Sequence, residues 1–107
     1  GKLNADKSNV IIYSTWYADK HDSNRLAIGS ERAMNPEEFF VVVPDMFSSG
    51  LSSSPSNSEA PQDGPRFPDI DVYDNVIAAH SLLRYKFGIE EIRLFVGFSM
   101  SAQQAFN

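Results

Sequence analysis

Apolar residues gather along the chain in three short runs separated by polar stretches. The runs cover residues 10–14, 39–43 and 89–96. The first run lacks the alternation of apolar and polar residues that is typical of a strand with one face exposed to solvent. It therefore predicts a strand of a parallel sheet that is covered on both faces. The second run has the same character and ends at Pro44. The spacing between these two runs is long enough for a crossover connection, which favours parallel strands.

One stretch shows the periodicity of a helix, and the polar segments predict shorter helical pieces. Residues 71–87 repeat apolar side chains at helical spacing, with Asp71 as a good N-cap residue and Gly88 as a stop. The sequence at 35–38 predicts a helix of one or two turns, because proline is favoured at the first helical position. Residues 26–28 predict a further helical turn. The order of strands and helices predicts an α/β fold with a mainly parallel sheet.

A long stretch without periodicity separates the second predicted strand from the long helix. Residues 45–68 are rich in serine and proline, a composition typical of a flexible linker. Long structureless segments within a compact domain are usually either functional or disordered, and Met46, Phe47 and Phe67 could anchor this one. The residues themselves leave both interpretations open.

Composition and charge exclude several classes of function. Hydrophobic residues make up 42% of the chain and charged residues 21%, as in an ordinary globular protein. The net charge of -5 argues against a nucleic-acid partner, whose phosphates it would repel. No apolar run approaches the roughly 20 residues that span a bilayer. The chain has no cysteine, which excludes thiolate catalysis and fits a reducing, cytoplasmic location.

Residues 97–101 carry the most chemical information. This Gly-Phe-Ser-Met-Ser stretch lies between a predicted strand and good helix formers. The order is close to the G-x-S-x-G nucleophile elbow, in which a strained turn exposes a serine hydroxyl, although Ser101 stands where the second glycine is expected. A serine nucleophile needs a base and an oxyanion site, and the Met100 amide would be one oxyanion donor. The alternative is that Ser99 is only a helix N-cap.

The sequence offers only some of the other groups that such a site needs, namely a second oxyanion donor, a base and an acid. The segment 15–17, after the first predicted strand, is in the right place for a second oxyanion donor, and packing aromatics are the alternative. The only histidines are His21, expected to be solvated in a polar loop, and His80, expected to be structural within the long helix. In this architecture the acid and the histidine of the triad follow the serine, so we expect both beyond Asn107. Two distant histidines predict no metal site.

Six segments extend the motif over nearly the whole chain: 13–17, 43–47, 50–57, 63–68, 73–76 and 97–105. In their order and spacing they resemble the α/β-hydrolase superfamily, and within it the homoserine O-acetyltransferase-like acyltransferases and their esterase relatives. The resemblance implies that the serine-rich loop is ordered and lies near the active site. It also implies that Ser99 is the nucleophile, with the backbone amides of Met100 and Trp16 as oxyanion donors and Thr15 or Tyr17 as near alternatives to Trp16.

The resemblance implies an enzyme, of which residues 1–107 would be the N-terminal part of a single α/β-hydrolase core domain. The first hypothesis is acyl transfer through an acyl-serine, from acetyl-CoA to an amino-acid hydroxyl. The second is hydrolysis of short-chain carboxylic esters. A third, of another class, is a non-catalytic or inactive α/β-hydrolase-like fragment. We expect small-molecule acyl donors and acceptors, no resident cofactor or metal, and no nucleic-acid or membrane partner; a homodimer of the full-length protein stays open.

Overall fold

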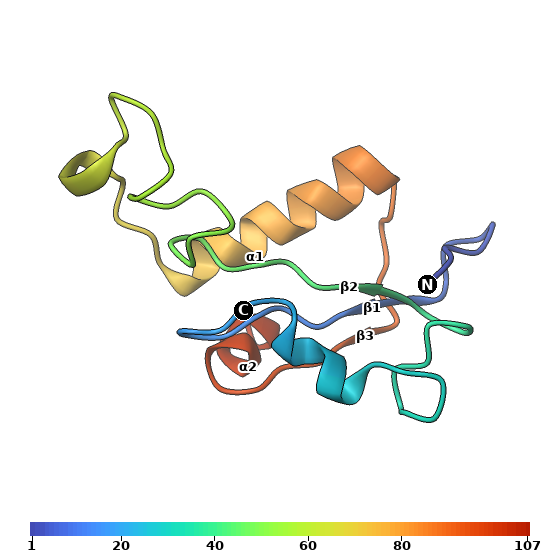
Figure 1. Ribbon diagram of the computed structural model, residues 1–107. Helices are drawn as coiled ribbons and strands as arrows, with labels where there is room; N and C mark the ends of the chain where they lie inside the picture. The colour runs from blue at the N-terminus through green and yellow to red at the C-terminus, as the bar shows by residue number, and fades with distance from the viewer.

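A sheet of three parallel strands lies at the centre of the computed structural model, which describes all residues 1–107 (Figure 1). The strands are β1 (Val10–Ile12), β2 (Phe40–Val42) and β3 (Leu94–Phe95), in the order β2-β1-β3. Val10 pairs with Phe40, and Ile11 pairs with Leu94. The predicted α/β fold with a parallel sheet is confirmed.

Strand β1 is buried on both faces, as its uninterrupted apolar run predicts. On one face of the sheet, Val10 and Ile12 form a buried cluster with Leu83 and Ile89. Ile11 faces the opposite side, where it packs with residues that include Tyr13 and Met34. Successive side chains of a strand point to opposite faces, so this central strand ties two layers together.

The outer strands are shorter and less buried than predicted. The residues of β2 are only partly buried, although the sequence predicts a second buried strand. In β3 only Leu94 and Phe95 pair with β1, while Glu90 and Glu91 are exposed. β2 is only partly buried because it is an edge strand with no neighbour on its outer side. The charged start of the third run stays outside the sheet because β1 is three residues long and offers few ladder positions.

The long helix forms where the periodicity predicts it. Helix α1 (Val72–Ser81) starts with a complete capping box, in which the side chains of Asp71 and Asp74 each accept the other's backbone N–H. It continues as the π-helix η3 (Leu82–Lys86) and ends before Gly88, whose φ is 60°. Figure 1 shows α1 along one side of the strands and the 3-10 helix η1 (Ser23–Ala27) on the other.

At 35–38 the structure has the shorter of the two predicted lengths, one turn. The segment forms a single turn in which the Asn35 carbonyl accepts the N–H groups of Glu38 and Phe39, and Phe40 then enters β2. No further helical turn fits between the turn and the strand.

The serine-rich segment is ordered by its own hydrogen bonds, as the family resemblance implies and as the composition alone leaves open. Ser54 is buried, accepts the Gly50 N–H and donates to the Ser52 carbonyl. The Asn57 amide donates to the same Ser52 carbonyl. The segment contains the 3-10 helix η2 (Gly64–Arg66) and no strand.

Candidate active site

Ser99 occupies a strained turn between β3 and the short helix α2 (Met100–Ala105). Its φ is 53° and its ψ is −126°, a backbone conformation that L-residues rarely adopt. The residue is exposed, and its side chain makes no capping hydrogen bond although it stands at the N-cap position. A serine used as a plain N-cap would accept a backbone N–H from the first turn. The N-cap alternative therefore lacks the contact that defines it, and the strand–turn–helix setting is that of a nucleophile elbow.

Gly97 permits the close approach of strand and helix in this turn. A Cβ atom on residue 97 would lie 2.5 Å from the Cα and N atoms of Ala102 and from the carbonyl oxygen of Ser101. These are backbone atoms, which cannot swing aside as a flexible side chain could. The first small position of the elbow therefore has to be glycine.

The second small position carries Ser101, and its hydroxyl has a partner. Ser101 is fully buried, and its Oγ lies 2.9 Å from the Oγ of Ser14, which is also fully buried. Ser14 comes directly after the strand-like Tyr13, so the hydroxyl pair joins the segment after β1 to the elbow helix. Sequence reasoning missed Ser14, and the only signal was the unusual serine at position 101.

The two predicted oxyanion donors line the same cavity. A hollow of about 540 Å³ is bounded by Trp16 and Met100 together with the loop after β2 and the start of α1. The backbone N–H groups of Trp16 and Met100 donate to no acceptor in the protein. The Trp16 ring packs edge-on against Phe98, the residue before Ser99, with 5.5 Å between ring centroids. The structure thus brings the segment after β1 against the elbow, as the resemblance implies.

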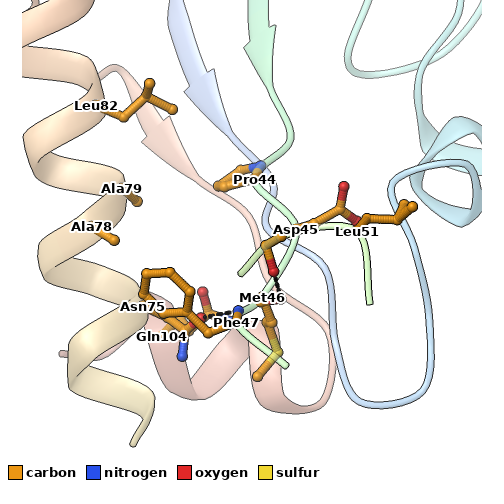
Figure 2. Close-up of a pocket in the computed structure, with 11 residues that line it drawn as sticks. Pro44, Asp45, Met46, Phe47, Leu51, Asn75, Ala78, Ala79, Leu82 and Gln104 are labelled. Carbon is orange, nitrogen blue, oxygen red and sulfur yellow. Dashed lines mark hydrogen bonds between the residues drawn. The ribbon is translucent and has the colours of Figure 1, made fainter. Parts of the chain in front are cut away.

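A second cavity of about 310 Å³ lies beside the first, under the loop after β2 (Figure 2). The two cavities share Met46, Phe47 and Asn75 as wall residues. Figure 2 shows the side chain of Asn75 turned toward Phe47, whose N–H it accepts at 2.8 Å. Asn75 is buried and also donates to the Asp71 carbonyl, so helix α1 holds the loop that separates the two cavities.

Neither histidine lies in the wall of the cavity that holds Trp16 and Met100. His21 is exposed, as predicted, and it is also paired: its Nδ1 lies 2.7 Å from Oδ2 of Asp45 and its backbone N–H donates to Oδ1. His80 is exposed on α1. Among the 107 residues no group of three or more His, Asp or Glu side chains could hold a metal ion, and no helix is long and apolar enough to cross a membrane.

Comparison with known proteins points to one superfamily. No protein-family model matches the chain. Ethyl acetate hydrolase of Pseudomonas veronii is 43% identical over 107 residues, which cover 99% of this chain and 31% of the relative. A probable esterase of Corynebacterium glutamicum is 39% identical, with 99% and 31% covered. Homoserine O-acetyltransferase of Chlorobium chlorochromatii is 36% identical, with 97% and 31% covered.

Solved structures match the fold closely. The acetyl esterase MekB superposes with a TM-score of 0.94 at 44% identity, covering 97% of this chain and 30% of that chain. An acetylester hydrolase from Corynebacterium glutamicum gives a TM-score of 0.94 at 40% identity, with the same coverage. The chain belongs to the α/β-hydrolase superfamily. Its relatives within that superfamily are esterases and homoserine O-acetyltransferases, and it spans about a third of their length.

Proposed function

We propose that the full-length protein carrying this chain hydrolyses short-chain carboxylic esters through an acyl-serine formed on Ser99. The observation that carries the proposal is the strained, uncapped Ser99 directly before Met100, whose backbone amide is free. Met100 and Trp16, whose amide is also free, line one cavity. This is the arrangement that exposes a nucleophile next to donors for a developing negative charge.

The proposed reaction has two steps, acylation of Ser99 and hydrolysis of the acyl-serine. The Ser99 Oγ attacks the ester carbonyl carbon while its proton passes to a general base, and the carbonyl oxygen becomes an oxyanion held by the Met100 and Trp16 amides. Collapse expels the alcohol, which takes up the proton. Water then attacks the acyl-serine and releases the carboxylic acid. We expect the base and its acid partner beyond residue 107, since neither His21 nor His80 lies in the wall of the cavity that Trp16 and Met100 line.

The proposed substrate is a small acetyl ester. Apolar side chains such as Trp16, Met46 and Phe47 form much of the cavity wall, a lining suited to a short acyl or alkyl group. The relatives that favour this choice are named for ethyl acetate and acetyl ester hydrolysis, and they are more identical to the chain than the transferases are. We propose small-molecule partners only, no resident cofactor, and a cytoplasmic location.

Acyl transfer from acetyl-CoA to homoserine is the second candidate. Its support is the 36% identity to a homoserine O-acetyltransferase, over 97% of this chain. Both reactions share the acyl-Ser99 intermediate and differ only in whether water or a bound alcohol accepts the acyl group. The acceptor therefore has to be identified by its product.

A kinetic comparison tests the proposal. The full-length protein is assayed with ethyl acetate alone and with acetyl-CoA plus homoserine, and the products are quantified. We expect acetate and ethanol from the ester, and a loss of at least about 10³-fold in kcat for Ser99→Ala because the nucleophile is removed. Ser53→Ala, an exposed serine outside the cavity, is the matched control and should retain wild-type rates.

Three results would change the conclusion. O-acetylhomoserine as the main product would favour the transferase. Unchanged turnover by Ser99→Ala would refute the role of Ser99. No turnover of either substrate would favour the third hypothesis, an inactive α/β-hydrolase-like protein.

A further inference from the structure

We infer that Ser101 and Ser14 are positioning residues, whose buried hydroxyl pair holds the two oxyanion donors at a fixed separation. This inference rests on the proposed function and deepens it. Ser101 is the residue after Met100, and Ser14 lies two residues before Trp16. The 2.9 Å Oγ–Oγ hydrogen bond therefore joins the two backbone segments that carry the donors.

The pair is closed off from solvent. Both serines have no exposed surface, so neither hydroxyl can exchange its partner for bulk water. A buried hydroxyl without a partner is costly, and the bond is correspondingly hard to break in the folded protein. The joint between the segments is thus stiff, as an oxyanion site requires if its donors are to be in place before charge develops.

A second bond acts between the same two segments. The Nε2 of Gln104, one turn further along α2, donates to the Thr15 carbonyl at 3.2 Å, and Gln104 is also buried. Thr15 is fixed from the other side as well, because its N–H donates to the Pro44 carbonyl and its Oγ1 accepts the Met46 N–H. The residue before Trp16 is therefore held at three points, and only the Ser14–Ser101 bond reaches the elbow turn itself.

This arrangement explains how the elbow tolerates a serine where glycine is expected. A serine side chain at position 101 adds volume in the crowded interface between strand and helix. Its hydroxyl is placed against Ser14, so the additional atoms form a contact between the segments instead of a clash. The two serines act as a unit, and we expect neither to be useful without the other.

The test uses the full-length protein and four variants: Ser101→Ala, Ser14→Ala, the double variant, and Ser101→Gly. Two quantities are measured for each, steady-state hydrolysis of ethyl acetate and the second-order rate constant for phosphonylation of Ser99 by a fluorophosphonate probe. Both reactions build negative charge on an oxygen in the oxyanion site. Asn9→Ala is the matched control, since the Asn9 side chain also joins chain segments, by donating to the Lys2 and Glu38 carbonyls, but lies directly before β1 and outside the cavity.

We expect each single alanine variant to lower kcat and the phosphonylation rate by about 3- to 30-fold with KM within about twofold, because misplaced donors weaken binding of the transition state more than of the substrate. The double variant should be within about twofold of the slower single variant, because each single variant already breaks the Ser14–Ser101 hydrogen bond. Ser101→Gly should also be slow, although it restores the residue of the elbow motif. Asn9→Ala should keep its rates within about twofold whatever it costs in melting temperature.

The inference is overturned if Ser101→Ala and Ser14→Ala keep wild-type kcat and labelling rates, or if their effects multiply in the double variant. It is equally overturned if Ser101→Gly is as fast as the wild type, since the hydroxyl would then be merely tolerated. Wild-type protein that neither turns over ester nor takes up the probe at Ser99 marks a failure of the proposed function instead, and the positioning role then falls with it.

Discussion

Gly97 and Ser101 flank Ser99 with two different solutions to the same steric problem. At Gly97 there is no space for a side chain, since a Cβ would meet three backbone atoms at 2.5 Å. At Ser101 a side chain fits because its hydroxyl forms a hydrogen bond with the hydroxyl of Ser14. The motif alone predicts that both positions are small. Only the structure distinguishes a position that must be glycine from one where a polar partner compensates for added volume.

Substitution of Gly97 by alanine should therefore damage both stability and activity. We expect a loss of about 1–3 kcal/mol in the free energy of unfolding, the usual cost of overpacking, together with a fall in ester hydrolysis because the turn at Ser99 shifts. Urea unfolding and kcat measurements would check this. Gly29→Ala is a suitable control, because its Cβ would meet only the side chain of the exposed Arg32, at 3.3 Å or more. Equal stability of the two variants would contradict the steric explanation.

Strands and helices that depend on neighbouring residues are predictable from the sequence, whereas contacts between distant segments are not. The apolar run at 10–14, the periodicity of 71–87 and the cap at Asp71 predict β1 and α1 because each depends on neighbouring residues. The ordering of the serine-rich loop depends on partners such as Asn57 that its composition does not specify. The pairing of His21 with Asp45 joins residues from loops after two different strands, and no local pattern encodes it.

The contact between α1 and the loop after β2 offers a test at this scale. Asn75→Ala removes the acceptor of the Phe47 N–H and the donor to the Asp71 carbonyl, both at 2.8 Å. We expect a loss of about 1–3 kcal/mol in unfolding free energy, because the partly buried Phe47 amide is left unsatisfied. Hydrogen exchange at Phe47 should become faster, while exchange in β1 changes only with global stability. Protection at Phe47 equal to the wild type would contradict this anchoring role. Asp69→Ala, exposed and outside these contacts, serves as control.

The 107 residues do not form a closed globule. Their solvent-accessible surface is 6996 Å², whereas a compact monomer of this size exposes about 5,900 Å². The radius of gyration is 14.5 Å, against about 13 Å for a typical domain of this length. Large apolar side chains stay exposed, including Tyr17, Phe98 and Phe106. The chain has the topology of its superfamily with only part of a covered core.

The isolated 107-residue chain should consequently be marginally stable. We expect a broad thermal transition, binding of a hydrophobic dye and concentration-dependent association, because an exposed sheet edge and apolar surface favour contacts between molecules. Calorimetry and light scattering would measure these properties. A sharp, cooperative transition of a monomer would contradict the expectation.

Direct labelling tests most simply whether Ser99 is the nucleophile. Full-length protein is treated with a fluorophosphonate probe, digested, and its modified residue located by mass spectrometry. We predict a single stoichiometric adduct on the peptide that contains Ser99. The adduct should not form when the protein is denatured before labelling, and it should not form in Ser99→Ala. An adduct on another residue, or no adduct on a protein that hydrolyses ester, would refute the role of Ser99 as the nucleophile.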